Sequence, residues 1–243
     1  MFFLWLVSLR LKNAGLVDLG WVTGLVGTEW IYFWKAQGFG PRKFLIFLMV
    51  SLWGLRLAAH LAARLARDPS EDARYQKIRE AWKTRLNLKF LFFFLFQGVL
   101  VVVLSLPFLI ASIHEANTLS IFEGLGLGIW VIAISGEALA DAQLKCFKSD
   151  PAHKPKVCQA GLWNYSRHPN YFFEWLVWVS FFIFALGSRG GWMGVISPAL
   201  MLYLLLFVSG VPAAELQSLR SRGEAYREYQ RTTSVFVPWF KQE

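Results

Sequence analysis

The segment Gly161–Tyr171 holds polar side chains whose order suits the binding of an anionic group. Arg167 and His168 stand directly before Pro169, which keeps His168 out of helical geometry and is well placed at a helix start. The free amides of a helix N-terminus favour an anion such as a phosphate, and two basic side chains strengthen that preference. The segment therefore predicts a binding loop for an anionic ligand.

Two further side chains, Asn170 and Glu174, lie four residues apart and share one face of the helix that follows. The Asn170 amide offers both a donor and an acceptor, which matches a primary carboxamide such as that of nicotinamide. Glu174 can accept a hydrogen bond from an amide or from a ribose hydroxyl. These residues alone specify an anionic ligand and not a particular cofactor.

A second polar stripe, formed by Glu137, Asp141, Lys145 and Lys148, descends one face of a preceding apolar helix. We expect Asp141 to act like Glu174 from the facing helix, and the two lysines to attract phosphates. Charged groups inside membrane spans are costly and usually mark a site. The alternative is an internal salt-bridge network that holds the helices together.

A third stripe consists of Arg56, His60 and Arg64, spaced four residues apart on one helix face. A structural network explains this stripe equally well, and the two arginines are also able to snorkel to the membrane interface. The stripe therefore leaves a functional and a structural interpretation open.

The elements that position these side chains are runs of roughly 20 apolar residues, the length that spans a bilayer as a helix. Hydrophobic residues make up 56% of the 243-residue chain, more than a soluble domain usually has. We predict an all-α, polytopic membrane helix bundle of six to seven transmembrane helices, forming a single membrane domain over residues 1–243. The predicted spans are Leu16–Trp34, Phe44–Ala66, Phe90–Ile113, Ile121–Leu144, Tyr171–Leu186 and Trp192–Val211, while Met1–Leu9 either lies in the interface or extends the first helix.

The net charge of +9 follows the positive-inside rule, because the basic residues cluster in alternate connections. Residues 67–89, 145–167 and 220–241 are rich in Lys and Arg. The connections at 112–120 and 187–191 together contain a single basic residue of this kind, Arg189. We expect a bacterial inner-membrane protein with its basic side toward the cytoplasm. Lys35, Arg42 and Lys43 are exceptions, because they fall on the opposite side. Membrane lipids explain the charge, and no nucleic-acid partner is expected.

The two cysteines, Cys146 and Cys158, lie near the basic side and lack metal-ligand spacing. Because the cytosol is reducing, we expect neither a disulfide nor a metal site. Met1–Leu9 lacks a basic region and a cleavage site, so a removable signal peptide is not expected.

Several motifs together resemble the bacterial branch of the steroid 5α-reductase C-terminal-domain family. The most specific is the block from Glu137 to Glu174, with Glu137-Ala-Leu-Ala-Asp-Ala-Gln-Leu-Lys145 and Gly-Leu-Trp-Asn-Tyr-Ser-Arg-His-Pro-Asn-Tyr171. Trp53-Gly-Leu-Arg56 and the closing Val237-Pro-Trp-Phe240 are also similar to that branch. The resemblance covers roughly residues 18–240.

This resemblance implies an NADPH-dependent oxidoreductase acting on CH–CH groups, which reduces a C=C bond conjugated to a carbonyl in a lipid-soluble, steroid-like or other enone substrate. It implies a substrate side in the N-terminal helices, residues 1–112, and a cofactor-binding half in residues 113–243. It also implies a hydride transfer to the β-carbon while a hydrogen-bond donor polarises the carbonyl. The cofactor-binding residues expected are Asp141, Lys145, Lys148, Tyr165, Arg167, His168, Asn170, Glu174 and Tyr229.

The carbonyl-binding donor does not transfer from the family, because Leu61 stands where its tyrosine is expected. Glu29 and His60 are the first choices for this catalytic role, since both lie in membrane spans and can donate when protonated. A second departure is Phe173, where the bacterial branch usually has glycine, and its ring would narrow the cofactor groove. Further candidates for the donor are Tyr32, Tyr75 and Asp18.

Two other functions remain open. An S-adenosylmethionine-dependent membrane methyltransferase, of the isoprenylcysteine or phospholipid type, has a similar Arg-His-Pro motif and would use Glu215, Tyr226 and Tyr229. A transporter would also carry intramembrane charges, but no inverted repeat is visible. We favour the reductase, acting as a monomer on a lipid-soluble small molecule.

Overall fold

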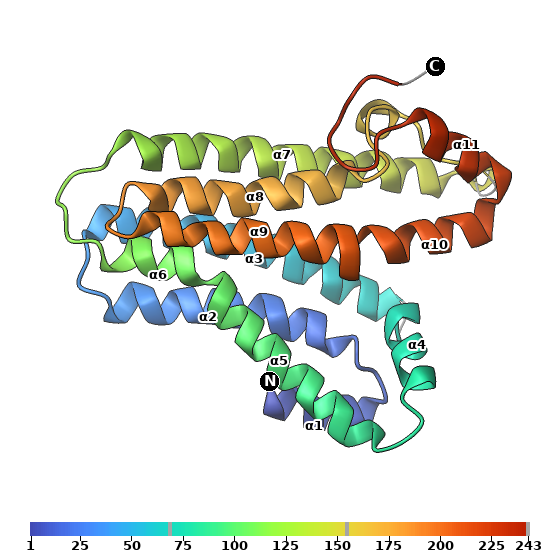
Figure 1. The fold of residues 1–243 in the computed structure, drawn as a ribbon, viewed down its shortest axis with the longest axis horizontal. Coiled ribbons are helices and arrows are strands. Elements are labelled where there is room, and N and C mark those ends of the chain that lie inside the picture. The colour runs from blue at the N-terminus through green and yellow to red at the C-terminus, as the bar shows by residue number, and fades with distance from the viewer. Residues whose placement is uncertain (68–69, 154–155, 242–243) are drawn as a thin grey trace. The chain divides into compact units, whose positions relative to one another are not determined.

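The computed structural model describes residues 1–67, 70–153 and 156–241, and the regular elements among these residues are all helical (Figure 1). The prediction of an all-α fold is thus confirmed. The chain forms two compact units: unit 1 comprises residues 1–123 and 184–197, and unit 2 comprises residues 124–183 and 198–243. That both units act as one membrane domain stays a prediction.

Unit 1 contains the first six α-helices of the chain and one short 3-10 helix. They are α1 (Phe2–Leu11), α2 (Leu16–Lys35), α3 (Gly40–Arg67), α4 (Ala73–Ala81), α5 (Leu86–Leu104), α6 (Leu106–Ile113) and the short 3-10 helix η3 (Gly191–Val195). The elements that lie wholly or mainly in unit 2 are α7 (Ile121–Ser149), η1 (Pro151–His153), η2 (Gly161–Asn164), α8 (Pro169–Leu186), α9 (Ile196–Tyr203), the π-helical η4 (Leu204–Val208), α10 (Val211–Arg222) and α11 (Glu224–Thr232).

Five helical segments among the described residues are long and apolar enough to cross a membrane, which supports an integral membrane protein. They are Gly40–Ala66, Leu86–Ile113, Ile121–Ser149, Pro169–Leu186 and Gly191–Arg222. Five of the six predicted spans correspond to these segments. The predicted span Leu16–Trp34 forms α2, which has 20 residues, but Asp18 and Glu29 lower its hydropathy. A sixth and a seventh crossing therefore stay predictions.

The last of these segments is interrupted near the basic side. Its chain passes from α9 into the π-helical turn η4 and then reaches Gly210, where a Cβ atom would lie 2.5 Å from the Leu205 carbonyl oxygen. Only glycine fits that contact, and Pro212 then stands at the start of α10, where a missing amide costs little. The break separates the membrane segment from the basic-side helix that carries Glu215.

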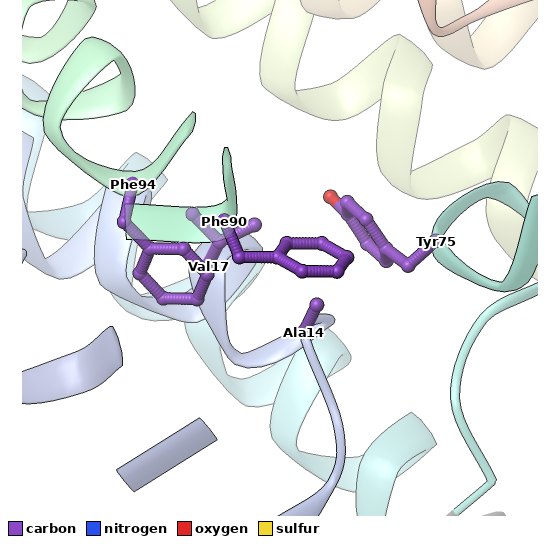
Figure 2. Packing of buried hydrophobic residues seen from close by; sticks show 5 residues of the cluster. All are labelled: Ala14, Val17, Tyr75, Phe90 and Phe94. Atoms are coloured by element: carbon purple, nitrogen blue, oxygen red, sulfur yellow. The ribbon is translucent and has the colours of Figure 1, made fainter. Parts of the chain in front are cut away.

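The interior of unit 1 depends on the close approach of α2 to α3. A Cβ atom at Gly54 would lie 2.2 Å from a methyl group of Val26, so glycine at this position lets the two helices meet. At the basic end, the turn before α2 packs with α4 and α5. Figure 2 shows this cluster of Ala14, Val17, Tyr75, Phe90 and Phe94, with the Tyr75 ring facing Phe90.

Arg42 explains one exception to the charge asymmetry in the sequence. Its side chain is 1% exposed, and its Nε donates to Glu123 Oε1 at 2.6 Å. Its Nη1 also donates to the carbonyl oxygens of His114 and Ala116, each at 3.0 Å. Arg42 is thus a buried structural cation that organises the connection before α7, and not a topogenic charge on the surface.

A polar latch holds α4 against the start of α2. Asp72 caps α4 by accepting from the Arg74 backbone amide at 2.9 Å, and it pairs with the guanidinium groups of Arg74 and Arg64. Arg74 also reaches Asp18 at 2.8 Å, and the Tyr75 hydroxyl donates to Asp18 at 2.6 Å. Both Asp18 and Tyr75 are therefore engaged in this latch.

We expect the latch to weaken in acid. Burial alone would raise the pKa of Asp72, but hydrogen bonds from Arg74 and Arg64 outweigh it and lower the pKa from 3.8 to about 2. A lowered folded-state pKa means that the stabilisation is complete above the ordinary value and is lost as the pH falls toward the lowered one. The contribution is about 2 kcal/mol. Thermal unfolding in detergent should show this loss in the wild type between about pH 5 and pH 2.

The variant Asp72→Asn is compared with the control Asp150→Asn, because the Asp150 carboxylate is about half exposed. Asp72→Asn should already be destabilised at neutral pH and should depend less on pH in the acid range. Asp150→Asn should follow the wild type. Identical pH profiles for the wild type and Asp72→Asn would contradict the expectation.

Candidate functional site

The loop that follows α7 is fixed to that helix at its beginning. Gly161 has a φ of 56°, and a Cβ atom there would lie 2.2 Å from the side-chain amide nitrogen of Gln143, so glycine is favoured. The Leu162 amide donates to Gln143 Oε1 at 3.0 Å, and the Trp163 indole donates to the Ala140 carbonyl oxygen at 2.9 Å. Both bonds reach the turn of α7 that contains the predicted cofactor residue at position 141.

The middle of the loop is fixed by Tyr229 from α11. Its hydroxyl donates to the Trp163 carbonyl oxygen and, at 3.0 Å, to that of Ser166. Burial, and then the neighbouring Tyr226, raises the pKa of Tyr229 well above its ordinary value, so the phenol stays a donor. Tyr229 therefore shapes the loop from within, and its hydroxyl is already engaged there.

Arg167 is bound to the C-terminal part of the chain. Its Nε donates to Glu215 Oε1 at 2.7 Å, and its Nη1 donates to the carbonyl oxygens of Gln230 at 3.0 Å and Thr233 at 2.6 Å. Its backbone amide donates to the Ser234 carbonyl oxygen at 2.8 Å. These contacts give Arg167 a role in positioning the loop.

His168 is buried directly before α8. Its backbone amide donates to Ser166 Oγ at 3.1 Å, and its ring is stacked on that of Tyr171, with centroids 5.3 Å apart. Its Nε2 lies 3.5 Å from Glu215 Oε1. The Arg-His pair thus shares one carboxylate, and α8 begins at Pro169 as the sequence predicts.

Asn170 and Glu174 occupy the first turns of α8, one turn apart on the same face. Glu174 is buried, and its Oε1 accepts from the Trp178 indole at 3.0 Å. The Asn170 Oδ1 atom is also buried, but it has no hydrogen-bond partner among the described residues. A buried acceptor without a partner is costly, and such groups are typical of ligand sites. The Asn170 Oδ1 atom is therefore a candidate contact for a hydrogen-bond donor of a ligand.

The predicted residues on α7 and in the loop differ in their exposure. Asp141 is half-buried, whereas Lys145, Lys148 and Tyr165 are exposed. Within the described part of the chain, neither lysine has an ion pair. Burial raises the pKa of Cys158, while the charges of Lys148 and other cations oppose this shift, so Lys148 lies near the residues that precede the loop. Its charge is therefore available at the basic end of α7.

A family model described as a protein of unknown function (DUF1295) matches residues 4–233. The chain belongs to this family. An uncharacterized protein of Schizosaccharomyces pombe is 24% identical over 268 residues, covering 97% of this chain and 75% of the yeast protein. No solved structure matches the chain. These comparisons establish the family, and its chemistry has to be inferred from the residues.

The chain accommodates Phe173 by a matching glycine on α7. A Cβ atom at Gly136 would lie 2.4 to 2.5 Å from three atoms of the Phe173 ring. The ring therefore lies directly against the α7 backbone, and the two helices approach each other at this point. Phe173 fills the space next to Gly136, whereas Asn170 lies one turn nearer the loop.

We expect Gly136→Val to destabilise the protein by about 1–3 kcal/mol, because the added atoms overlap the Phe173 ring. Adding Phe173→Ala should recover much of this loss. Gly128→Ala on the same helix is the control, since a Cβ atom there has nothing within 4 Å. Thermal unfolding of the wild type and these three variants measures the effect, and equal stability of Gly136→Val and Gly128→Ala would show that the contact is absent.

The candidates for a carbonyl-binding donor lie in unit 1 and differ in their surroundings. Glu29 on α2 is 0% exposed, and neither carboxylate oxygen has a hydrogen-bond partner among the described residues. Tyr32, one turn on, has its hydroxyl 3.1 Å from Ser105 Oγ. His60 is exposed on α3. Glu29 is thus the buried polar group of unit 1 that most needs a partner.

Several residues that shape the loop were not predicted from the sequence. Gln143, Trp163 and Ser166 carry no charge, and their contribution is a hydrogen bond to a backbone group. The positive φ of Gly161 leaves a sequence signal, because glycine is favoured there. The hydrogen-bond partners of the other three residues leave no such signal in the sequence.

Proposed function

We propose that this chain is a membrane-embedded oxidoreductase that uses NADPH to reduce a C=C bond conjugated to a carbonyl in a lipid-soluble substrate. The observation that carries the proposal is the buried Oδ1 atom of Asn170, which has no hydrogen-bond partner among the described residues. The NH₂ group of a nicotinamide carboxamide is a donor that would satisfy this acceptor. The resemblance to steroid 5α-reductases supports the same assignment.

The chain offers suitable groups for the rest of a dinucleotide. Asn170 and Glu174 would hold the nicotinamide end, and Asp141 would accept from a hydroxyl or amide. Lys145 and Lys148 provide two exposed cations for phosphate groups. Arg167 and Tyr229 would contribute to cofactor binding indirectly, because their hydrogen bonds hold the loop in place. We also propose that this basic side faces the cytoplasm of a bacterial cell.

The reaction needs a hydride, a proton and a polarised carbonyl. Asn170 and Glu174 would hold the nicotinamide of NADPH, which would supply the hydride for the β-carbon, while a proton from water would add to the α-carbon to leave NADP⁺ and a saturated bond. Glu29 is our candidate donor to the carbonyl oxygen, because its buried carboxyl group lacks a partner and can donate when protonated. Its role would be to stabilise the negative charge that develops on that oxygen.

An apolar cavity in unit 1 supports a lipid-soluble substrate. It has a volume of about 230 Å³ and lies between α2 and α3. The residues that line it are Val22, Thr23, Val26, Gly27, Trp30, Gly54, Leu55 and Ala58. Only Thr23 brings a side-chain hydroxyl, so this cavity suits a hydrocarbon ring or chain.

The methyltransferase alternative depends on Glu215 and two tyrosines of α11. Glu215 is already bonded to Arg167 and Gln230, and the Tyr229 hydroxyl to two backbone carbonyls. Recruiting these groups for S-adenosylmethionine would require the loop to lose its main contacts. We therefore favour the reductase.

Ligand-induced stabilisation of the purified protein separates these functions. A ligand that binds only the folded state stabilises it by about 2.7 kcal/mol at a concentration of 100 Kd. We expect NADPH to raise the unfolding temperature and S-adenosylmethionine to leave it unchanged. Stabilisation by S-adenosylmethionine alone would overturn the proposal.

A further inference from the structure

The C-terminal segment, residues 234–241, lies across the candidate loop and is called the terminal strap below. Figure 1 shows this red segment beside the yellow loop that follows α7. Three hydrogen bonds tie the strap to residues 165–167: Arg167 N to Ser234 O at 2.8 Å, Ser166 Oγ to Phe236 O at 2.8 Å, and Trp239 N to Tyr165 O at 2.9 Å. The strap is therefore hydrogen-bonded to each of the loop residues 165, 166 and 167.

One side of the terminal strap is packed against α8. Phe236 is buried, and its ring centroid lies 5.7 Å from that of Phe172 and 6.0 Å from that of Trp175. Both partners belong to the first two turns of α8, which is a segment apolar enough to cross a membrane. The strap consequently lies beside the N-terminal end of a candidate membrane span.

The other side of the strap exposes large apolar side chains. Trp239 is 63% exposed and Phe240 is 74% exposed, with Val237 also exposed between them and the buried Phe236. The Phe240 ring meets that of Tyr165, which is itself exposed, at 6.2 Å. Tryptophan and tyrosine are enriched at the boundary between hydrocarbon and water, where one part of the ring is apolar and another is wet.

The strap also carries a positive charge at its end. Lys241 donates to the Gln159 side chain and has no carboxylate partner among the described residues. Arg222 donates to the Lys156 carbonyl oxygen and also lacks an ion pair in the described ranges. Cations next to interfacial aromatic side chains complement a surface of anionic headgroups.

From this arrangement we infer that the exposed edge of the terminal strap, Val237, Trp239 and Phe240, inserts into the headgroup region of the leaflet on the basic side, with Lys241 against anionic phospholipids. The bilayer then holds the strap on the loop at residues 165–167. Contact with lipid would thus keep the candidate site in its ordered form. The inference concerns the membrane surface and does not depend on which ligand the loop binds.

Site-directed spin labelling of the full chain in lipid vesicles tests the depth of the strap. A nitroxide at Phe240→Cys, in a Cys146→Ser background, should meet dissolved oxygen more readily than a water-soluble nickel complex. The matched control is Glu228→Cys on α11, an exposed position that should favour the nickel complex. Equal access of nickel to both labels would overturn the inference.

A second measurement asks whether lipid holds the strap on the loop. Amide hydrogen exchange of residues 165–170 should be several-fold faster for Trp239→Ser with Phe240→Ser than for the wild type in vesicles containing phosphatidylglycerol. The same double variant in detergent should differ less from the wild type. Unchanged exchange in vesicles would refute the coupling between lipid contact and the order of the loop.

Discussion

Replacing Asn170 with alanine should weaken NADPH binding roughly ten- to hundredfold without destabilising the protein in the absence of ligand. The buried Oδ1 atom has no partner among the described residues, so its removal takes away an unsatisfied acceptor. In the complex, the same change removes a hydrogen bond and leaves a carboxamide donor unpaired, which costs about 1–3 kcal/mol. The affinity for NADPH is therefore expected to fall, while the stability of the ligand-free protein is not.

Calorimetric titration and thermal unfolding of the same samples measure both quantities. Asn164→Ala is a matched control, because this asparagine belongs to the same loop and no hydrogen bond of its side chain is described. Its affinity for NADPH should equal that of the wild type. If Asn170→Ala binds NADPH as tightly as Asn164→Ala, the nicotinamide end lies elsewhere.

The α8 part of the site could be predicted from the sequence because its geometry is local. Pro169 marks the helix start, and a spacing of four residues places Asn170 and Glu174 on one face whatever surrounds them. The structure confirms the helix start. That these two residues bind a cofactor stays a prediction, which the unpartnered Oδ1 atom supports.

The roles of Arg167 and Tyr229 could not be separated from ligand binding by sequence. Arg167 meets Glu215, 48 residues away, and Tyr229 meets Trp163, 66 residues away. Whether a guanidinium or phenol faces a ligand or a partner in the chain depends on these distant contacts. A motif indicates which residue types a site needs. It does not indicate which of these residues bind the ligand and which hold the binding residues in position.

The same limit applies to predictions of membrane topology from the positions of charged residues. The positive-inside rule counts Lys and Arg in connections, and it treats Arg42 as an exposed charge on the less basic side. Its partner Glu123 lies 81 residues further along the chain and makes the pair a buried one. The apolar run Leu16–Trp34 likewise predicted a span, but α2 is less apolar than the five candidate spans because it contains Asp18 and Glu29.

Glu123→Gln should be among the most destabilising single changes in unit 1. Arg42 and Glu123 are 1% and 2% exposed, and their Nε and Oε1 atoms are 2.6 Å apart. Removing one partner of a buried ion pair leaves an uncompensated charge, at a cost of about 3–5 kcal/mol. Unfolding in mixed micelles with increasing sodium dodecyl sulfate should reveal this loss.

Arg227→Met provides the comparison, because Arg227 pairs with Glu224 at 3.1 Å but both side chains are more than two-thirds exposed. An exposed pair contributes less than about 1 kcal/mol, so this variant should unfold almost like the wild type. The double change Arg42→Met with Glu123→Leu should recover part of the loss, since it removes both buried charges. The recovery should stay incomplete, because Arg42 also donates to the carbonyl oxygens of His114 and Ala116, and these would lose their partner. If Glu123→Gln were no more destabilising than Arg227→Met, burial would not govern the strength of this pair.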